Sequence, residues 1–123
     1  MTEKVSPMEP QALIELVVSA LEDLKCVDLV NIDVRDKTSV ADNMIVCTGT
    51  SRRHVVSLAE NVVMEAKEAG QAPRGAEGLE SGEWALVDLG DVIVHVMQQS
   101  TRDLYELEKL WSMAPSSAQA NGE

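Results

Sequence analysis

Two stretches of the chain have the apolar spacing of a helix with one buried face. In both, apolar residues recur three or four positions apart. The first helix should begin at residues 6–9, where a serine cap is followed by proline and glutamate, and end near Lys25. The second should begin after Ser51 and end at about Ala69, next to a glycine. The predicted buried positions are Leu13, Leu16, Val17, Ala20, Leu21 and Leu24 in the first helix, and Val55, Leu58, Ala59, Val62, Ala66 and Ala69 in the second.

Shorter apolar runs bounded by turn residues predict strands. In the first of them Val30, Ile32 and Val34 share one face, since side chains alternate along a strand. The last two runs are joined by Gly90-Asp91, which is typical of a tight hairpin turn. Strands are expected at residues 27–34, 44–48, 84–89 and 92–97, with room for a short edge strand near 72–75.

A third helix should start at Ser100 or Thr101 and end near residues 111–113. Its apolar positions fall within an arc of roughly 120° and are predicted to be buried. Tyr105 lies outside this arc beside charged residues, so it should face outward or toward the edge of a groove. The positions predicted to be buried are Leu104, Leu107, Leu110 and Trp111.

The order of these elements predicts a single α/β domain. The domain should contain a mixed sheet of four or five strands and about three helices. Three helices are few for covering both faces of such a sheet, so one face is expected to be only partly covered. The domain should span residues 7–113, between a flexible N-terminus of residues 1–6 and a disordered tail of residues 114–123.

The charge of the chain narrows the partners it can bind. The 123 residues include 10 Lys and Arg against 21 Asp and Glu, which gives a net charge of −11. Because nucleic-acid affinity rests on basic residues that neutralise phosphates, little direct nucleic-acid binding is expected. A basic protein is the better partner. No apolar run approaches the roughly 18 residues of a membrane span, and no signal peptide is recognisable, so we expect a soluble, cytoplasmic protein.

Two groups of residues could carry chemistry, and each has a plainer interpretation. The segment Gly49–His54 leads from a strand through two hydroxyl residues and two arginines into a helix, which would suit an anion. Its spacing is neither that of a P-loop nor that of a dinucleotide site, and helix capping accounts for it. Asp33, Asp88 and Asp91 could hold a divalent metal for nucleotidyl or phosphoryl transfer. A hairpin turn accounts for the last two, so this enzyme is kept only as an alternative.

The two cysteines and two histidines lack the spacing of a zinc site, and two histidines leave few options for a catalytic triad. Cys26 and Cys47 lie in apolar surroundings and are predicted to be reduced thiols rather than a redox pair. His54 and His95 show no ligand-type spacing. The sequence therefore predicts no cofactor, no metal site and no enzymatic activity.

All three aromatic residues of the chain lie between Trp84 and Trp111. In the strand 92–97 the valines share one face, which is the natural core, so His95 should lie on the less covered face, toward solvent or a partner. Trp84 starts the neighbouring strand and is expected on the same open face. Two alternatives stay open: His95 as a half-buried histidine with satisfied hydrogen bonds, and Trp84 packed under the glycine-rich loop.

The motifs CTGTSRRHV, GAEG, WALVDLGDVIVHVMQ and TRDLYELEKLW, in this order, resemble the Iojap family, whose bacterial members are ribosomal silencing factors. The resemblance runs from about Leu13 to Trp111. It implies a small α/β domain shaped like a nucleotidyltransferase but without that active site. It also implies binding to a large-subunit ribosomal protein at the intersubunit face. A factor bound there blocks association of the 30S and 50S subunits and represses translation under nutrient limitation.

The resemblance also suggests which residues make the contact. Four of them match family motif positions, and a fifth lies beside them on the predicted last helix. We expect the partner-binding residues to be Trp84, Asp91, His95, Tyr105 and Lys109. The alternatives to a silencing factor are the metal-dependent transferase, a ribosome-biogenesis adaptor and an adaptor for another basic protein. A homodimer formed through the open sheet face or a free edge strand is also compatible with the sequence.

Overall fold

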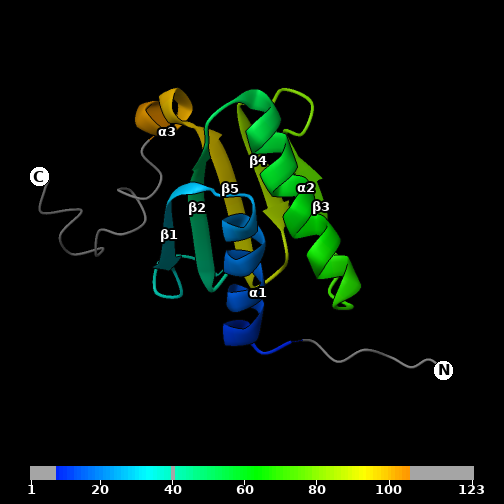
Figure 1. The fold of residues 1–123 in the computed structure, drawn as a ribbon. Coiled ribbons are helices and arrows are strands. Elements are labelled where there is room, and N and C mark those ends of the chain that lie inside the picture. Colours follow the sequence, from blue (N-terminus) through cyan, green and yellow to red (C-terminus); the bar gives the residue numbers. More distant parts are fainter. Residues whose placement is uncertain (1–7, 40, 106–123) are drawn as a thin grey trace, which may run out of the picture.

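Five strands form one mixed sheet in the computed structural model, which describes residues 8–39 and 41–105 (Figure 1). The strand order is β1-β2-β5-β4-β3, with β2 and β5 parallel at the centre and the other neighbours antiparallel. The elements are α1 Pro10–Asp23, β1 Val27–Asp33, β2 Asn43–Gly49, α2 Arg52–Glu68, β3 Gly75–Glu77, β4 Trp84–Asp88, β5 Val92–Gln98 and α3 Gln99–Tyr105. The predicted α/β class, with a mixed sheet and three helices, is confirmed.

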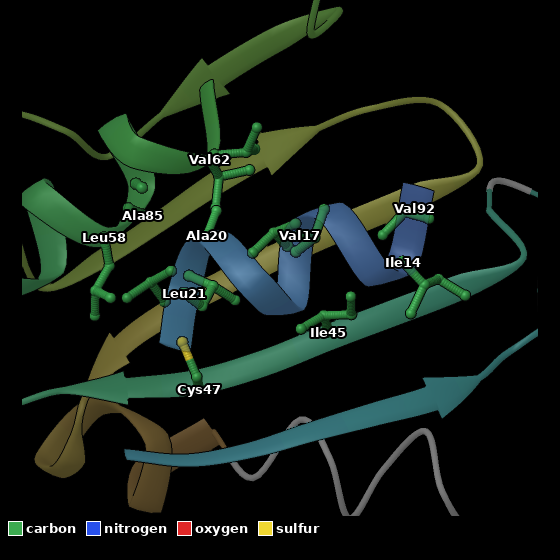
Figure 2. Packing of buried hydrophobic residues seen from close by; sticks show 14 of the residues in the cluster. Ile14, Val17, Ala20, Leu21, Ile45, Cys47, Leu58, Val62, Ala85 and Val92 are labelled. Atoms are coloured by element: carbon green, nitrogen blue, oxygen red, sulfur yellow. The ribbon is translucent and has the colours of Figure 1, made fainter. Parts of the chain in front are cut away.

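Helices α1 and α2 lie side by side over one face of the sheet (Figure 1). Their apolar stripes meet the inward-facing residues of β2, β4 and β5, and Leu21, Ile45 and Leu58 are among the side chains that are fully buried between the layers (Figure 2). Burial of this kind contributes about 25 cal/mol for each Å² of apolar surface removed from water. The main core therefore lies between this helix pair and one sheet face.

The opposite sheet face carries a second, smaller apolar cluster. Its buried members come from β1, β2 and β5 and from the residue after β1, and they are Ile32, Val34, Met44, Val46 and Met97. Around them Val30, Leu86 and Ile93 keep part of their side chains in solvent. Helix α3 contacts β5 and β2 at one end of the sheet (Figure 1). The prediction of one partly covered face is therefore confirmed, and we call it the open face.

Helix α1 begins later than predicted. Glu9 is the N-cap residue and Pro10 takes the first turn, so the predicted start at residues 6–9 is wrong. The reason is steric, because a residue before proline is pushed out of the helical region and Glu9 is accordingly extended, with ψ 149°. The edge strand likewise lies at Gly75–Glu77 rather than near residues 72–75.

The third helix also departs from the prediction. It begins at Gln99, and Leu104, predicted to be buried, is 74% exposed. Amphipathic spacing indicates which residues share a helix face, but not whether another element covers that face. Leu107, Lys109, Leu110 and Trp111 lie outside the described residues. All of residues 1–7 and 106–123 lie outside the described residues, so the predicted domain boundaries near residues 7 and 113 stay predictions.

Candidate functional site

Three of the predicted contact residues come together on the open face. The indole Nε1 of Trp84 donates a hydrogen bond to Nδ1 of His95 over 2.9 Å. The Trp84 ring also contacts the ring of Tyr105, with centroids 4.7 Å apart and planes tilted by 49°. We call Trp84, His95 and Tyr105 the aromatic cluster. Ring pairs in such a tilted geometry are attractive beyond the area that they bury.

The sheet register explains how Trp84 and His95 meet. Trp84 pairs with Met97 and Leu86 pairs with His95, so Trp84 and His95 are diagonal neighbours on adjacent antiparallel strands. On the other side of β5, Val46 of β2 pairs with His95. The histidine therefore occupies the middle of the sheet, flanked by apolar side chains on both neighbouring strands.

His95 lies on the predicted face but is buried, with only 6% of its surface exposed. The expectation that it faces solvent is wrong, because Trp84 and the neighbouring strands enclose it. The alternative that stayed open, a covered histidine with a hydrogen-bond partner, describes it better. Burial lowers the pKa of the imidazole from 6.5 to about 4, since desolvation disfavours the charged form. The ring is therefore neutral at pH 7. An indole N–H can only donate, so Nδ1 is the acceptor and the ring proton resides on Nε2.

Tyr105 is 53% exposed, as its place outside the apolar arc of the third helix predicted. Helix α3, which carries it, is held to the sheet by Arg102, whose Nη1 donates to Oγ1 of Thr48 over 2.8 Å. Arg102 is only 5% exposed. The sequence did not indicate a role for this residue, because a single arginine on a predicted helix gives no signal that its guanidinium turns inward.

Asp91 lies apart from the aromatic cluster. It precedes the first residue of β5, whereas Trp84 pairs near the end of that strand, so roughly 20 Å of strand separates the two. The Asp91 side chain is exposed, and its backbone carbonyl accepts hydrogen bonds from the N–H groups of Asp42 and Asn43. The structure therefore brings three of the predicted contact residues together and leaves Asp91 at the other end of the strand. Lys109 is outside the described residues.

The helix start at Gly49–His54 is built for capping. Oγ of Ser51 accepts a hydrogen bond from the backbone N–H of His54 over 3.0 Å. The imidazole of His54 connects two segments, because Nδ1 lies 2.8 Å from the backbone N of Thr50 and Nε2 lies 2.7 Å from the carbonyl oxygen of Leu24. Ser51 and His54 are thus used to start α2 and to join it to the turn after α1.

Two of the three carboxylates of the transferase alternative, Asp33 and Asp88, have structural roles. Asp33 pairs with Arg35 at 2.6 Å on the surface, and the hydrogen bonds of Arg35 lower the Asp33 pKa to about 2. Oδ1 of Asp88 accepts from the backbone N–H of Gly90 over 2.9 Å and so closes the hairpin turn. Among residues 8–39 and 41–105, no three His, Cys, Asp or Glu side chains are grouped to hold a metal ion.

Cys26 and Cys47 are both free thiols, as predicted, and Cys47 is fully buried in the main core (Figure 2). Burial raises the pKa of both thiols, which keeps them protonated at neutral pH. Neither therefore has the thiolate character of a catalytic nucleophile. Among the helices that the structure describes, none has the length and apolar character needed to cross a membrane.

The described residues form an α/β domain with an apolar, aromatic-bearing sheet face, which is typical of a protein that binds a partner, while Asp33, Asp88 and Ser51 serve in an ion pair, a turn and a helix cap. Comparison with known proteins identifies the family to which the chain belongs. Residues 7–123 match the family described as "Ribosomal silencing factor during starvation", so the chain belongs to the ribosomal silencing factor family. The resemblance seen in the sequence is confirmed. So are the predictions of a ribosomal silencing factor and of a protein that is not an enzyme, since the family is non-enzymatic.

Individual relatives support the assignment over most of the chain. A ribosomal silencing factor of Haemophilus influenzae is 50% identical over 101 residues, which are 82% of this chain and 99% of that protein. The mouse protein "Mitochondrial assembly of ribosomal large subunit protein 1" is 31% identical over 103 residues, covering 81% of this chain and 45% of the mouse protein. A crystal structure of a Chromobacterium violaceum protein superposes with a TM-score of 0.84 at 49% identity, covering 88% of this chain and 91% of that one.

Proposed function

We propose that the protein binds a large-subunit ribosomal protein on the face of the 50S subunit that meets the 30S subunit. Bound there in the cytoplasm, it sterically prevents the two subunits from joining and so represses translation under nutrient limitation. The observation that carries this proposal is the aromatic cluster, which places the half-exposed ring of Tyr105 against Trp84 on the open face. Large aromatic side chains are the residues most enriched at the centres of protein interfaces.

The surroundings of the cluster suit a large interface. Val30, Leu86 and Ile93 extend the partly exposed apolar surface across the sheet. An interface of standard size buries about 800 Å² on each partner, which is wide enough to include Asp91 at the other end of β5. We therefore assign Trp84, Tyr105 and Asp91 as partner-contacting residues and keep Lys109 as a further candidate.

Charge supports a basic protein as the partner. At a net charge of −11 the chain is repelled by phosphate backbones, so rRNA is a poor primary contact. Basic ribosomal proteins, by contrast, attract it and speed the encounter. The same charge weighs against a homodimer through the open face, because two copies repel each other. A dimer would appear as a higher mass in sedimentation velocity, most clearly at high salt.

Tyr105→Ala tests the assignment at a position where folding is not at risk, because the side chain is 53% exposed. We expect this variant to lose about 2 kcal/mol of binding, roughly 30-fold in affinity for isolated 50S subunits. The matched control is Met64→Ala, which removes another exposed apolar side chain, 47% exposed, from the opposite side of the molecule on α2. It should leave affinity within about threefold of the wild type.

The measurement is co-sedimentation with separated 30S, 50S and 70S particles. Wild-type protein should pellet with 50S subunits and lower the yield of 70S particles when 30S subunits are added. If wild-type protein does not pellet with 50S subunits, the proposed function is wrong. If Tyr105→Ala and Met64→Ala bind equally well, the surface is wrong while the function stands.

An adaptor in large-subunit assembly is the second candidate, and it is favoured by the similarity to the mouse protein named for that process. The two functions differ in the particle that is bound. An assembly adaptor should associate with immature large-subunit precursors and be absent from mature 50S subunits. A silencing factor should bind mature 50S subunits and inhibit translation in a reconstituted extract.

A further inference from the structure

His95 lies beneath the surface that Trp84 and Tyr105 form, and its own contribution to that surface is small. Only 6% of the residue is exposed, so a partner docked on the open face meets almost none of the imidazole. The polar contact of the ring with that surface is the 2.9 Å hydrogen bond from Nε1 of Trp84 to Nδ1. The hydrogen bond to Trp84 is therefore a route by which His95 can act on partner binding without touching the partner.

The chemistry of this hydrogen bond fixes the orientation of Trp84. An indole has one donor and no acceptor, so its N–H has to find an acceptor wherever the ring is partly buried. Here the cross-strand neighbours of His95 are Val46 and Leu86, whose side chains carry no acceptor. The indole N–H donates to Nδ1 of His95. With the N–H turned inward to it, the indole ring stands against Tyr105, with centroids 4.7 Å apart.

We propose that His95 is a positioning residue. It sets the orientation of the Trp84 indole through Nδ1, so that Trp84 and Tyr105 present one preformed contact surface to the partner, and it does not touch the partner itself. This inference rests on the proposed function, because it concerns the same surface. Preformed side chains bind more tightly since less conformational entropy is lost on association.

A double-mutant cycle on 50S binding separates positioning from direct contact. His95→Leu removes the acceptor and should weaken binding about fivefold. Trp84→Phe removes the donor but keeps an aromatic ring. If His95 acts only through Trp84, adding His95→Leu to Trp84→Phe should change affinity by less than about twofold. If His95→Leu costs the same factor in both backgrounds, or costs nothing in the wild type, the inference is wrong.

Two further variants distinguish orientation from packing. His95→Asn keeps an oxygen acceptor near the position of Nδ1 and should recover most of the binding that His95→Leu loses. Met97→Leu changes an apolar neighbour that pairs with Trp84 but leaves the hydrogen bond in place, and it should bind as the wild type does. Loss of binding in Met97→Leu equal to that in His95→Leu would show that packing alone matters. The inference would then be overturned.

Nuclear magnetic resonance of the free protein gives a readout independent of the ribosome. The chain has two tryptophans, and the indole N–H signal that disappears in Trp84→Phe belongs to Trp84. That signal should move upfield and exchange faster with solvent in His95→Leu, and stay near its wild-type position in His95→Asn. An unchanged signal in His95→Leu overturns the inference even if 50S binding is intact. Absence of 50S binding by the wild type overturns the proposed function with it.

Discussion

Mild acid should destabilise the protein through His95. The folded-state pKa of this imidazole is lowered to about 4, whereas the unfolded chain titrates near 6.5. Between these two values the unfolded state binds a proton that the folded state does not, so the free energy of unfolding falls as the pH falls. The part of the free energy of unfolding that depends on a neutral His95 is fully present above pH 6.5. It is lost progressively as the pH falls to about 4. At pH 5 the loss amounts to about 2 kcal/mol, and at pH 4 to about 3 kcal/mol.

The geometry of the Trp84–His95 hydrogen bond also predicts, independently of the pKa, that acid destabilises the folded protein. A protonated imidazole carries hydrogen on both nitrogens, so Nδ1 could no longer accept from Trp84. Two N–H groups would then face each other across 2.9 Å. Protonation of His95 in the folded protein therefore costs both the hydrogen bond and the desolvation of a charge.

Urea unfolding at pH 7.5 and at pH 5 measures this effect. The wild type should lose about 2 kcal/mol more than His95→Asn, which has no imidazole at this position. Working at pH 5 separates His95 from Asp33, whose pKa is lowered from 3.8 to about 2 and which therefore loses its stabilising effect only at lower pH. If the wild type and His95→Asn lose equal stability between the two pH values, the imidazole is not buried in the neutral form described here.

Two further predictions concern the start of α2. Ser51→Ala should lower the free energy of unfolding by about 1 kcal/mol, because it removes the oxygen that accepts a hydrogen bond from the His54 N–H. Urea unfolding would measure this loss, with Ser57→Ala in the helix interior as the matched control. Gly49→Ala should lower the free energy of unfolding by about 1–3 kcal/mol, because a Cβ at this position would lie 2.7 Å from Cγ2 and 2.8 Å from the backbone N of Val55. A melting temperature equal to that of the wild type would contradict this packing.

The alternation of apolar residues was enough to assign the sheet faces. In β5 the residues at 92, 94 and 96 face the helices and His95 and Met97 face away, as their spacing predicted. In β1 the same argument placed Val30, Ile32 and Val34 together. Alternation works here because a strand admits only two side-chain directions, so one well-defined core face fixes the other.

The exposure of individual side chains could not be predicted from the spacing of apolar residues. His95 was expected to face solvent or a partner, with a half-buried histidine as the alternative, and it is buried. Leu104 was expected to be buried and is exposed. The exposure of each side chain depends on what packs against its face of the strand or helix. That coverage comes from elements distant in sequence and from side chains such as Arg102, which reaches from α3 to Thr48. A periodic pattern contains no information about such coverage.

The contact between Trp84 and His95 was, however, within reach of the sequence. A two-residue turn at Gly90-Asp91 makes Leu89 the partner of Val92, and counting back pairs Leu86 with His95 and Trp84 with Met97. Trp84 and His95 then follow as diagonal neighbours on the same face. Pairing an obligate donor with a residue that can accept would have predicted a buried histidine instead of an exposed one.

The buried imidazole also suggests why a binding surface of this kind is built with a histidine. Leucine at position 95 would fill the same space without any titratable group, and it would spare the protein the loss of stability in acid. It would leave the Trp84 indole without an acceptor in an apolar part of the sheet, and an unsatisfied buried donor costs about 1–3 kcal/mol. The indole would then turn its N–H toward water and away from its contact with Tyr105. An indole held against Tyr105 with its N–H turned into the sheet therefore needs an acceptor there, and at neutral pH an uncharged imidazole supplies one without burying a charge.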